Sequence, residues 1–363
     1  MKIDIIAGAR PNFIKISPII NQIKLKENFF KISYRLIHTG QHYDDDMSSN
    51  FFKQLNIPHP DINLNVGSSS HAKQTGDIML RYENVLNQEK PDICLVVGDV
   101  NSTMACSIVA KKYNLKVAHV EAGIRSFDLT MPEEINRMVT DSITDYFFTT
   151  SEFANQNLIN TGIKKNKIHF VGNVMIDTLK NQIKNFIKPD FFDRYKLSKK
   201  KYFVLTMHRP SNVDDKKKLI KLLDLIDSNT KNYPILFPVH PRTKSILSKN
   251  RSNFNNIIKV CPMTYLEFNY LVKNSSCVIT DSGGITEETT VMNVPCITLR
   301  NNTERPETIK YGTNLLVGHN SKKIINALNK VLEDKWHKGK IPKYWDGNSA
   351  SRIVNILLSL NEK

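Results

Sequence analysis

Short runs of β-branched and other apolar residues alternate with longer amphipathic stretches along almost the whole chain. This alternation is typical of parallel strands joined by helical crossovers. In the first half, the apolar runs predict strands at Ile3–Ala7, Tyr34–His38, Ile93–Val97, Val117–Val120, Tyr146–Thr149 and His169–Val171. The stretches between them predict helices at Phe13–Lys26, His71–Leu86, Ser102–Tyr113, Glu133–Asp141 and Glu152–Asn160.

The second half of the chain repeats the same alternation. Its apolar runs predict strands at Tyr202–Met207, Ile235–Pro238, Ile257–Val260, Val278–Thr280, Cys296–Leu299 and Leu315–Val317. Its amphipathic stretches predict helices at Lys217–Ile226, Tyr265–Val272, Ile285–Val291, Lys322–Leu332 and Arg352–Leu360. The whole pattern therefore predicts an α/β protein with two similar sheet-and-helix units and a cleft between them.

A break in the pattern at Gly172-Asn173 divides the chain. We expect an N-terminal Rossmann-like domain at residues 1–172 and a polar connector, helical to about Asp193, at residues 173–200. A C-terminal Rossmann-like domain is expected at residues 201–345, and a last helix within residues 346–363 is expected to pack back on the N-terminal domain. A chain of 363 residues is long enough for two domains that each bury a core.

The net positive charge of the chain indicates which kinds of ligand or partner it can bind. Lys plus Arg number 51 and Asp plus Glu number 35, which gives a net charge of +16. That charge suits an anionic ligand, a nucleic acid or an acidic membrane face. The basic residues are scattered, however, and no zinc finger, aromatic RNA-binding motif or basic helix accompanies them. We therefore expect no nucleic-acid partner.

Other features of the composition predict a soluble protein of the cytoplasm. No apolar stretch approaches the roughly 18 residues that a membrane span needs, and the charged N-terminal sequence is unlike a signal peptide. We therefore expect no membrane partner. The five cysteines form no CxxC pair, which fits a reducing compartment. The histidines and cysteines show no zinc-binding spacing, so we expect no metal.

Polar residues follow the apolar runs, and open α/β sheets bind ligands beyond the carboxyl ends of their strands. The first strand ends in Gly8-Ala9-Arg10-Pro11-Asn12, and Lys15 follows in the next helix. Two cations beside a helix start, where backbone N–H groups also attract anions, indicate an anion site. The segment has neither the GxGxxG nor the Walker pattern, so an ordinary turn is the alternative.

Carboxylates collect after two neighbouring strands of the first half. Asp99 and Glu121 each follow an apolar run, and Glu133 opens the next predicted helix together with Glu134 and Arg137. Such a group suits acid–base chemistry, because repulsion and desolvation raise one pKa while a nearby cation lowers another. The alternative is that the paired glutamates only cap a helix.

The second half carries the features of a nucleotide site. His208 follows one strand, and Asp281-Ser282-Gly283-Gly284 opens a helix directly after another. Small residues at a helix start let the backbone approach a pyrophosphate. Glu288 lies one turn further and suits the hydroxyl groups of a ribose, while Arg305 adds a cation near the same edge. A histidine at a strand end is often only structural, which is the alternative for His208.

In this order, the motifs resemble the non-hydrolysing UDP-N-acetylglucosamine 2-epimerase family over nearly the whole chain. The matching residues are Gly8-Ala9-Arg10-Pro11, Gly40-Gln41-His42, Gly98-Asp99, His119-Val120-Glu121-Ala122-Gly123, Pro132-Glu133-Glu134 with Asn136-Arg137, Gly172-Asn173, His208-Arg209, Pro238-Val239-His240, Asp281-Ser282-Gly283-Gly284 with Glu287-Glu288, and Glu304-Arg305-Pro306-Glu307. The resemblance implies two Rossmann-like domains in the glycosyltransferase-B arrangement, with the active site in the interdomain cleft.

The resemblance also implies the reaction, which inverts C2 of a UDP-2-acetamido sugar by eliminating UDP to a 2-acetamidoglucal and adding it back. It implies no redox cofactor or metal, and it suggests a homodimer that supplies surface polysaccharide precursors. By similarity, the catalytic residues are the acid–base candidates Asp99, Glu121 and Glu133, together with His208, which assists catalysis or holds the diphosphate. The residues that bind the UDP-sugar are, by the same similarity, Arg10, Lys15, Arg137, Phe268 (uracil), Ser282, Gly283 and Gly284 (phosphates), Glu288 (ribose) and Arg305 (nucleotide edge).

Two stretches depart from the family pattern. After Gln41-His42 the chain has Tyr43-Asp44-Asp45, and after His208-Arg209 it has Pro210-Ser211-Asn212, without the expected glutamate. Bacterial relatives often use polar residues there to bind an activating second UDP-sugar, so we do not expect such activation here.

The departures leave alternatives for the substrate, and the shared fold and motifs leave alternatives for the reaction. The substrate is UDP-N-acetylglucosamine or a modified UDP-sugar such as UDP-2,3-diacetamido-2,3-dideoxyglucuronate. A hydrolysing UDP-N-acetylglucosamine 2-epimerase and a glycosyltransferase of the same fold are the other candidates. A transferase would need the nucleotide site but not the carboxylates of the first half.

Overall fold

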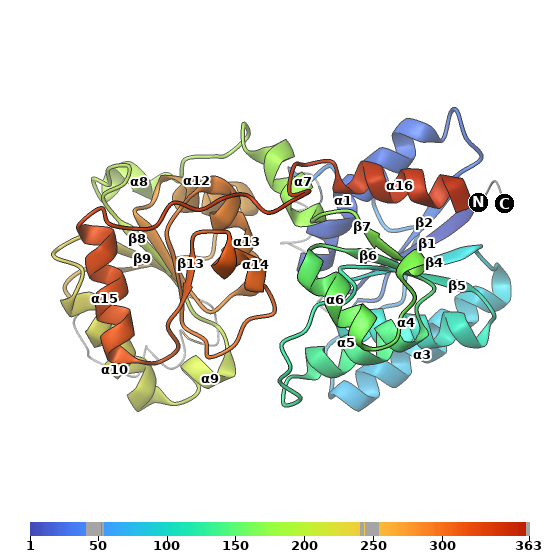
Figure 1. Ribbon diagram of the computed structural model, residues 1–363, viewed down its shortest axis with the longest axis horizontal. Coiled ribbons are helices and arrows are strands. Elements are labelled where there is room, and N and C mark those ends of the chain that lie inside the picture. The colour runs from blue at the N-terminus through green and yellow to red at the C-terminus, as the bar shows by residue number, and fades with distance from the viewer. Residues whose placement is uncertain (41–51, 53, 240–242, 244–253, 361–363) are drawn as a thin grey trace. The chain divides into compact units, whose positions relative to one another are not determined.

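The computed structural model describes residues 1–40, 52, 54–239, 243 and 254–360. The chain forms two compact units (Figure 1). The first unit comprises Met1–Asn181 and the chain from Lys343 onward, and the second comprises Gln182–Pro342. Residues 173–200, expected as a connector, are thus shared between the two units. Each unit contains a parallel sheet with helices, so the α/β fold class is confirmed.

In the described part of the first unit, seven parallel strands form a sheet in the order β3-β2-β1-β4-β5-β6-β7. The strands are β1 (Lys2–Ala7), β2 (Ser33–His38), β3 (Ile62–Asn63), β4 (Ile93–Val97), β5 (Lys116–Val120), β6 (Tyr146–Thr149) and β7 (Ile168–Phe170). Up to β6 this is the Rossmann order, which reverses direction between β1 and β4.

The described part of the second unit contains a six-stranded parallel sheet in the order β10-β9-β8-β11-β12-β13. The strands are β8 (Phe203–Thr206), β9 (Ile235–Pro238), β10 (Ile257–Val260), β11 (Cys277–Thr280), β12 (Cys296–Thr298) and β13 (Asn314–Leu316). The Rossmann order is therefore repeated, and here the reversal lies between β8 and β11.

Helices cover both faces of the first sheet, and α1 and α16 pack together while α3, α4 and α5 lie side by side on the other face (Figure 1). The helices are α1 (Arg10–Lys26), α3 (His71–Gln88), α4 (Asn101–Lys112), α5 (Pro132–Ile143), α6 (Glu152–Asn160), α7 (Val174–Gln182) and α16 (Ser349–Leu360). A short 3-10 helix, η1 (Lys165–Lys167), precedes β7. This double cover explains why β4 is an unbroken apolar run and is buried at all its positions.

Two apolar clusters form the core of the second unit. One centres on residues of β8, β9, α10 and α15, and the other includes residues of β8, α8 and α12. The helices are α8 (Phe191–Arg194), α9 (Pro210–Val213), α10 (Lys216–Ser228), α12 (Tyr265–Asn274), α13 (Gly283–Met292), α14 (Pro306–Lys310) and α15 (Ser321–Leu332).

The C-terminal segment belongs to the first unit, where side chains anchor it. The indole Nε1 of Trp345 donates to the Thr150 carbonyl at 3.0 Å, and the Ala350 amide donates to Asp177 Oδ2 at 2.7 Å. Asp177 therefore caps the start of α16 from the neighbouring α7. The apolar side of α16 is buried, including Ile353 and Leu357.

Every strand predicted from the sequence is present, with each end within one residue of its predicted position. The prediction named no separate element at β3, η1, α8, α9 or α14. These elements have two, three, four, four and five residues, which is too short for a periodic pattern to emerge. In the described part of the chain, no helix is both long and apolar enough to cross a membrane.

Candidate active site

The strand order reverses once in each sheet, and open α/β sheets bind ligands at such a reversal. In the first unit, β1 and β4 are followed directly by Gly8 and Gly98. In the second unit, His208 comes two residues after β8, and Asp281 comes directly after β11. Among the residues expected from the sequence, Asp99, His208 and Ser282 thus follow strands at the reversal point of their own sheet.

A buried ion pair joins α1 to the end of β5. The Lys15 Nζ donates to Glu121 Oε2 at 2.5 Å, and both side chains are buried. Gly98 lies beside the pair, since a Cβ atom there would be 3.1 Å from Nζ and 3.7 Å from Oε2. Glu121 has a φ of 72°, which is uncommon for a residue with a side chain. Strained positions of this kind cluster at functional sites.

Asp99 follows Gly98 and is held by two residues of α5. Arg137 donates through Nε and Nη2 to Asp99 Oδ2, at 3.0 and 2.6 Å. Asn136 Nδ2 donates to the Asp99 carbonyl at 2.9 Å. Both the side chain and the backbone of Asp99 are therefore oriented by α5.

The adjacent glutamates at the start of α5 differ in their surroundings. Glu134 is buried and accepts hydrogen bonds from the Ser126 and Phe127 amides, both at 2.9 Å, and from Arg137 Nη1 at 2.5 Å. Glu134 thus organises the loop before the helix. Glu133 is exposed, and no hydrogen bond or ion pair within the described residues holds its side chain.

A buried histidine links the ends of β4 and β5 to α5. His119 places Nε2 2.8 Å from the Gly98 carbonyl and Nδ1 2.8 Å from Asp141 Oδ1. The other Asp141 oxygen accepts from the Gly123 amide at 3.1 Å and pairs with Arg125 at 2.6 Å. Burial would raise the pKa of Asp141, but His119 and Arg125 outweigh it and lower the pKa. This network holds the backbone at Gly98 and Gly123 in place, next to Asp99 and Glu121.

In the second unit, the start of α13 forms the expected cradle. Ser282 is the N-cap residue, and Gly283 and Gly284 form the first turn. The first amide groups of a helix lack partners within it and attract anions. A Cβ at Gly283 would lie 2.6 Å from Glu304 Oε1, so a larger residue there would displace the end of that side chain. Arg300 Nη2 pairs with the other Glu304 oxygen at 2.7 Å, which brings a buried cation to this helix start.

Two further arginines lie near α13. Arg209 Nη2 is 3.8 Å from Glu304 Oε1, and Arg305 Nε pairs with Glu287 Oε1 of α13 at 2.5 Å. Arg305 and Glu287 are both buried, so Arg305 ties the start of α14 to α13.

Glu288 is buried between α12 and α13. It accepts a hydrogen bond from the Tyr265 hydroxyl at 2.8 Å and a long one from Asn269 Nδ2 at 3.5 Å. Burial raises the pKa of Glu288 to about 7, although these two donors act against the shift. Phe268 lies on the same helix as Tyr265 and is half-buried against the core. The expected ribose and uracil residues are therefore on adjoining helices.

His208 is held by the carboxylate at the end of β11. Its Nδ1 lies 3.0 Å from Asp281 Oδ1. Asp281 is buried and also accepts from the His208 and Arg209 amides, at 3.1 and 3.0 Å. Burial would raise the pKa of Asp281, but His208, Asn212 and the Arg209 amide together lower it.

The remaining candidates are placed as follows. Arg10 is exposed at the first residue of α1. The motif residues Gln41, His42 and His240 lie outside the described residues. In the described parts of the chain, no group of three or more His, Cys, Asp or Glu side chains could hold a metal ion.

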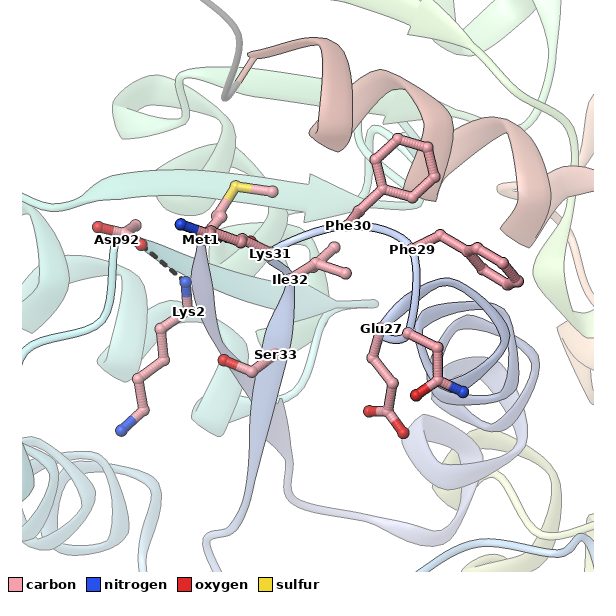
Figure 2. Close-up of a pocket in the computed structure, with 10 residues that line it drawn as sticks. Met1, Lys2, Glu27, Phe29, Phe30, Lys31, Ile32, Ser33 and Asp92 are labelled. Carbon is pink, nitrogen blue, oxygen red and sulfur yellow. Dashed lines mark hydrogen bonds between the residues drawn. The ribbon is translucent and has the colours of Figure 1, made fainter.

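A hollow of about 560 Å³ lies at the other end of the first sheet (Figure 2). It is lined by residues at the starts of β1 and β2, together with Phe29, Phe30 and Asp92. Figure 2 shows Asp92 beside the Lys2 backbone, whose amide donates to it at 2.7 Å. Since ligands bind at the carboxyl ends of parallel strands, we do not place the active site there.

Sequence reasoning missed several residues that hold the site together. Arg300 comes soon after β12, so a closer reading of the strand ends could have found it. Asn212 and Tyr265 gave no such signal, because their partners are distant in the sequence. Asp141 lies near the end of α5, where nothing in the sequence distinguishes it from a surface carboxylate.

Comparison with known proteins identifies the family. The family model described as UDP-N-acetylglucosamine 2-epimerase matches residues 24–358. The UDP-N-acetylglucosamine 2-epimerase of Methanocaldococcus jannaschii is 45% identical, over 98% of this chain and 99% of its own. The UDP-2,3-diacetamido-2,3-dideoxy-D-glucuronate 2-epimerase of Pseudomonas aeruginosa is 37% identical, over 99% of this chain and 100% of its own.

A solved structure of a family member is also similar to this chain. The M. jannaschii UDP-GlcNAc 2-epimerase in complex with UDP-GlcNAc and UDP has a TM-score of 0.89 and 44% identity, and the match covers 99% of this chain and 100% of that one. The fold is therefore of the glycosyltransferase-B type that the family resemblance implied. By family model, sequence identity and structure alike, the chain belongs to the UDP-N-acetylglucosamine 2-epimerase family.

Proposed function

We propose that the chain is a non-hydrolysing epimerase that interconverts UDP-N-acetylglucosamine and UDP-N-acetylmannosamine. The observation that carries this proposal is the pair of carboxylates at adjacent strand ends, each matched with a cation: Glu121 with Lys15 and Asp99 with Arg137. Membership of the family supports it. We further propose that the enzyme acts in the cytoplasm and supplies surface polysaccharide precursors.

The reaction that we propose has two halves. A base removes the C2 hydrogen as a proton while the bond between C1 and the UDP oxygen breaks, which leaves a C1=C2 double bond in 2-acetamidoglucal. UDP then adds back to C1, and an acid delivers a proton to the opposite face of C2. Because the C2 proton is barely acidic, the base must be held in place and the departing diphosphate must be stabilised.

We assign the acid–base chemistry to Asp99, Glu121 and Glu133. Asp99 and Glu121 are fixed by hydrogen bonds and ion pairs, which supports a role that needs a defined position. Glu133 is exposed on the first turn of α5 and is thereby accessible to a substrate. We assign Arg10 and Lys15 to the stabilisation of the diphosphate charge.

We assign nucleotide binding to the second unit. Ser282, Gly283 and Gly284 would receive the phosphates, because the start of α13 offers amide groups and lies near Arg300. Glu288 would accept hydrogen bonds from the ribose, and Phe268 would lie against the uracil.

Proton NMR in deuterated buffer tests the proposal. Purified protein with UDP-N-acetylglucosamine is expected to give UDP-N-acetylmannosamine with deuterium at C2 of both sugars, because re-protonation takes its hydrogen from solvent. Free N-acetylmannosamine with UDP would instead indicate a hydrolysing enzyme. No exchange, despite bound UDP, would exclude UDP-N-acetylglucosamine as the substrate.

A modified UDP-sugar is the second candidate, and a relative supports it. The P. aeruginosa protein named for the diacetamido glucuronate sugar matches nearly the whole chain, although at lower identity than the M. jannaschii epimerase. The same NMR assay with that sugar separates the candidates, since the true substrate exchanges C2 at the higher kcat/KM.

We propose a homodimer as the assembly. Leu80 of α3 and Ile135 and Met138 of α5 are 62%, 48% and 46% exposed, and the two helices flank α4 on one face of the first unit. An exposed apolar surface of this kind suits a second copy of the chain. Light scattering should show a dimer, and Met138→Glu should shift the mass to the monomer. Ile341→Glu, at an exposed apolar residue of the second unit, is the control and should leave the mass unchanged.

A further inference from the structure

A continuous line of hydrogen bonds crosses the carboxyl edge of the second sheet and ends at His208. Nε2 of His319 lies 2.5 Å from Asn212 Oδ1, and Asn212 Nδ2 donates to Asp281 Oδ2 at 2.9 Å. The other oxygen of Asp281 lies 3.0 Å from Nδ1 of His208. Asn212 and Asp281 are buried, and the segments that follow β8, β11 and β13 supply the four residues.

The chemistry of each group sets the direction of this line. His208, Asn212 and the Arg209 amide lower the pKa of Asp281 in spite of its burial, so at neutral pH its carboxylate only accepts hydrogen bonds. His208 must then donate through Nδ1 and Asn212 through Nδ2. The same Asn212 nitrogen also donates to the Leu299 carbonyl at 3.3 Å. Because Asn212 Nδ2 donates to these two acceptors, the atom of Asn212 that faces His319 is Oδ1, an acceptor. Nε2 of His319 must therefore carry the hydrogen of this bond.

We propose that Asp281 is a positioning residue that, with Asn212 and His319 behind it, holds His208 in the tautomer with hydrogen on Nδ1 and leaves Nε2 for the substrate. This inference rests on the proposed function, because it deepens the catalytic role that the family resemblance implies for His208. The opposite tautomer would turn the Nδ1 lone pair toward a carboxylate and is disfavoured by repulsion. Nε2 of His208 has no partner within the described residues, and the side chain is half exposed.

The tautomer can be observed directly in the full-length enzyme. Long-range proton–nitrogen NMR of protein labelled with ¹⁵N-histidine distinguishes the two ring nitrogens, and His208→Gln and His319→Gln identify the two signals among the ten histidines. We expect hydrogen on Nδ1 of His208 and on Nε2 of His319. Hydrogen on Nε2 of neutral His208 in the wild-type protein would overturn the proposal.

Substitution of the carboxylate supplies the second test. Asp281→Asn should turn His208 into a mixture of tautomers and lower kcat about 10- to 100-fold, with KM changed by less than about threefold. Asn212→Leu, which leaves the carboxylate but removes its buried donor, should show the same changes to a smaller extent. It also provides the kinetic test if Asp281→Asn does not fold. Wild-type kcat and tautomer in a folded Asp281→Asn protein would overturn the proposal.

Asp227→Asn is the matched control. Asp227 is a buried carboxylate of the same unit and accepts from the Asn255 and Asn256 amides, both at 2.8 Å. Its substitution should lower stability but leave kcat and the His208 signal unchanged. The proposed function can fail separately. If the wild-type enzyme epimerises no UDP-sugar while Asp281→Asn still changes the His208 tautomer, the proposed function falls and the positioning of His208 by Asp281 stands.

Discussion

Single side chains at the strand ends owe their chemistry to partners that come from distant parts of the chain. Glu121 is paired with Lys15 from the first helix, whereas Glu288 lies among neutral donors and has a pKa raised to about 7. The position of Glu121 after an apolar run, and of Glu288 in the helix that follows another run, could be predicted from the sequence. Their different electrostatic surroundings could not be predicted in this way. The residues that contact each carboxylate come from separate elements, which only the packing of the fold brings together.

The substitution Glu121→Gln tests the acid–base role of this single side chain. It keeps the shape of the side chain but removes the carboxylate, so kcat should fall about 100- to 10,000-fold. UDP affinity, measured by calorimetry, should change little because the cradle residues are in the second unit. Loss of UDP binding together with activity would show that the variant is misfolded or that Glu121 binds the nucleotide.

Glu288 should release a proton when UDP binds near pH 7. Its pKa of about 7 leaves roughly half of the population protonated there, and ribose hydroxyls would favour the ionised form. Calorimetry in buffers of different ionisation enthalpy should therefore show a release of about half a proton per UDP beyond that of Glu288→Gln. Equal release by both proteins would contradict the ribose assignment.

The same raised pKa affects stability with a definite sign. The ordinary pKa of glutamate is 4.5, and the folded protein raises it to about 7. The folded state therefore binds the proton more tightly than the unfolded state, and this contribution to stability is lost as pH rises from about 4.5 through 7. In wild-type protein, the midpoint of urea unfolding should fall over this range more steeply than in Glu288→Gln. A parallel decline in both proteins would contradict the shift.

Helices and strands follow closely from the periodicity of apolar residues, and their junctions depend on a few glycines. Gly172, after β7, has a φ of 95°, and a Cβ there would lie 2.0 Å from the Tyr344 carbonyl. The sequence marked Gly172 as a break between domains. The structure shows that the returning C-terminal segment also packs against Gly172 through Tyr344, which local sequence could not reveal.

Gly172→Ala should therefore destabilise the first unit by about 3 kcal/mol, from left-handed strain and overpacking combined. Limited proteolysis should cleave the segment that carries Trp345 and α16 more readily in this variant. Gly162→Ala is the matched control, since its φ is 87° but nothing lies within 4 Å of a Cβ there. It should cost only about 1 kcal/mol in urea unfolding. Equal losses would show that the contact with Tyr344 contributes nothing.

As a whole molecule, the chain has one continuous unit and one that is assembled from two segments. Gln182–Pro342 contains a complete sheet, its own core and the cradle at α13. The first unit needs α16, which covers α1 and comes from the other end of the chain. Removal of the C-terminal segment would expose the apolar face of α1 that α16 covers.

Residues 182–342 should therefore fold alone and bind UDP without catalysing C2 exchange. Circular dichroism and calorimetry check the fold and the binding, and the NMR assay checks the chemistry. Residues 1–181 alone should aggregate or unfold at lower temperature than the same unit in the full chain. A folded fragment 182–342 without UDP affinity would contradict the assignment of the nucleotide site to this unit.

The sequence by itself determined the fold class, nearly all strands and helices, the reversal-point motifs and the family, because periodicity and strand-end residues are local properties of the chain. Only the tertiary structure decided which side chains meet: Lys15 with Glu121, Arg137 with Asp99, Arg305 with Glu287, and His319 with His208 through Asn212 and Asp281. These pairs join residues far apart in sequence. Their pairing depends on sheet order and helix packing, which no local pattern encodes.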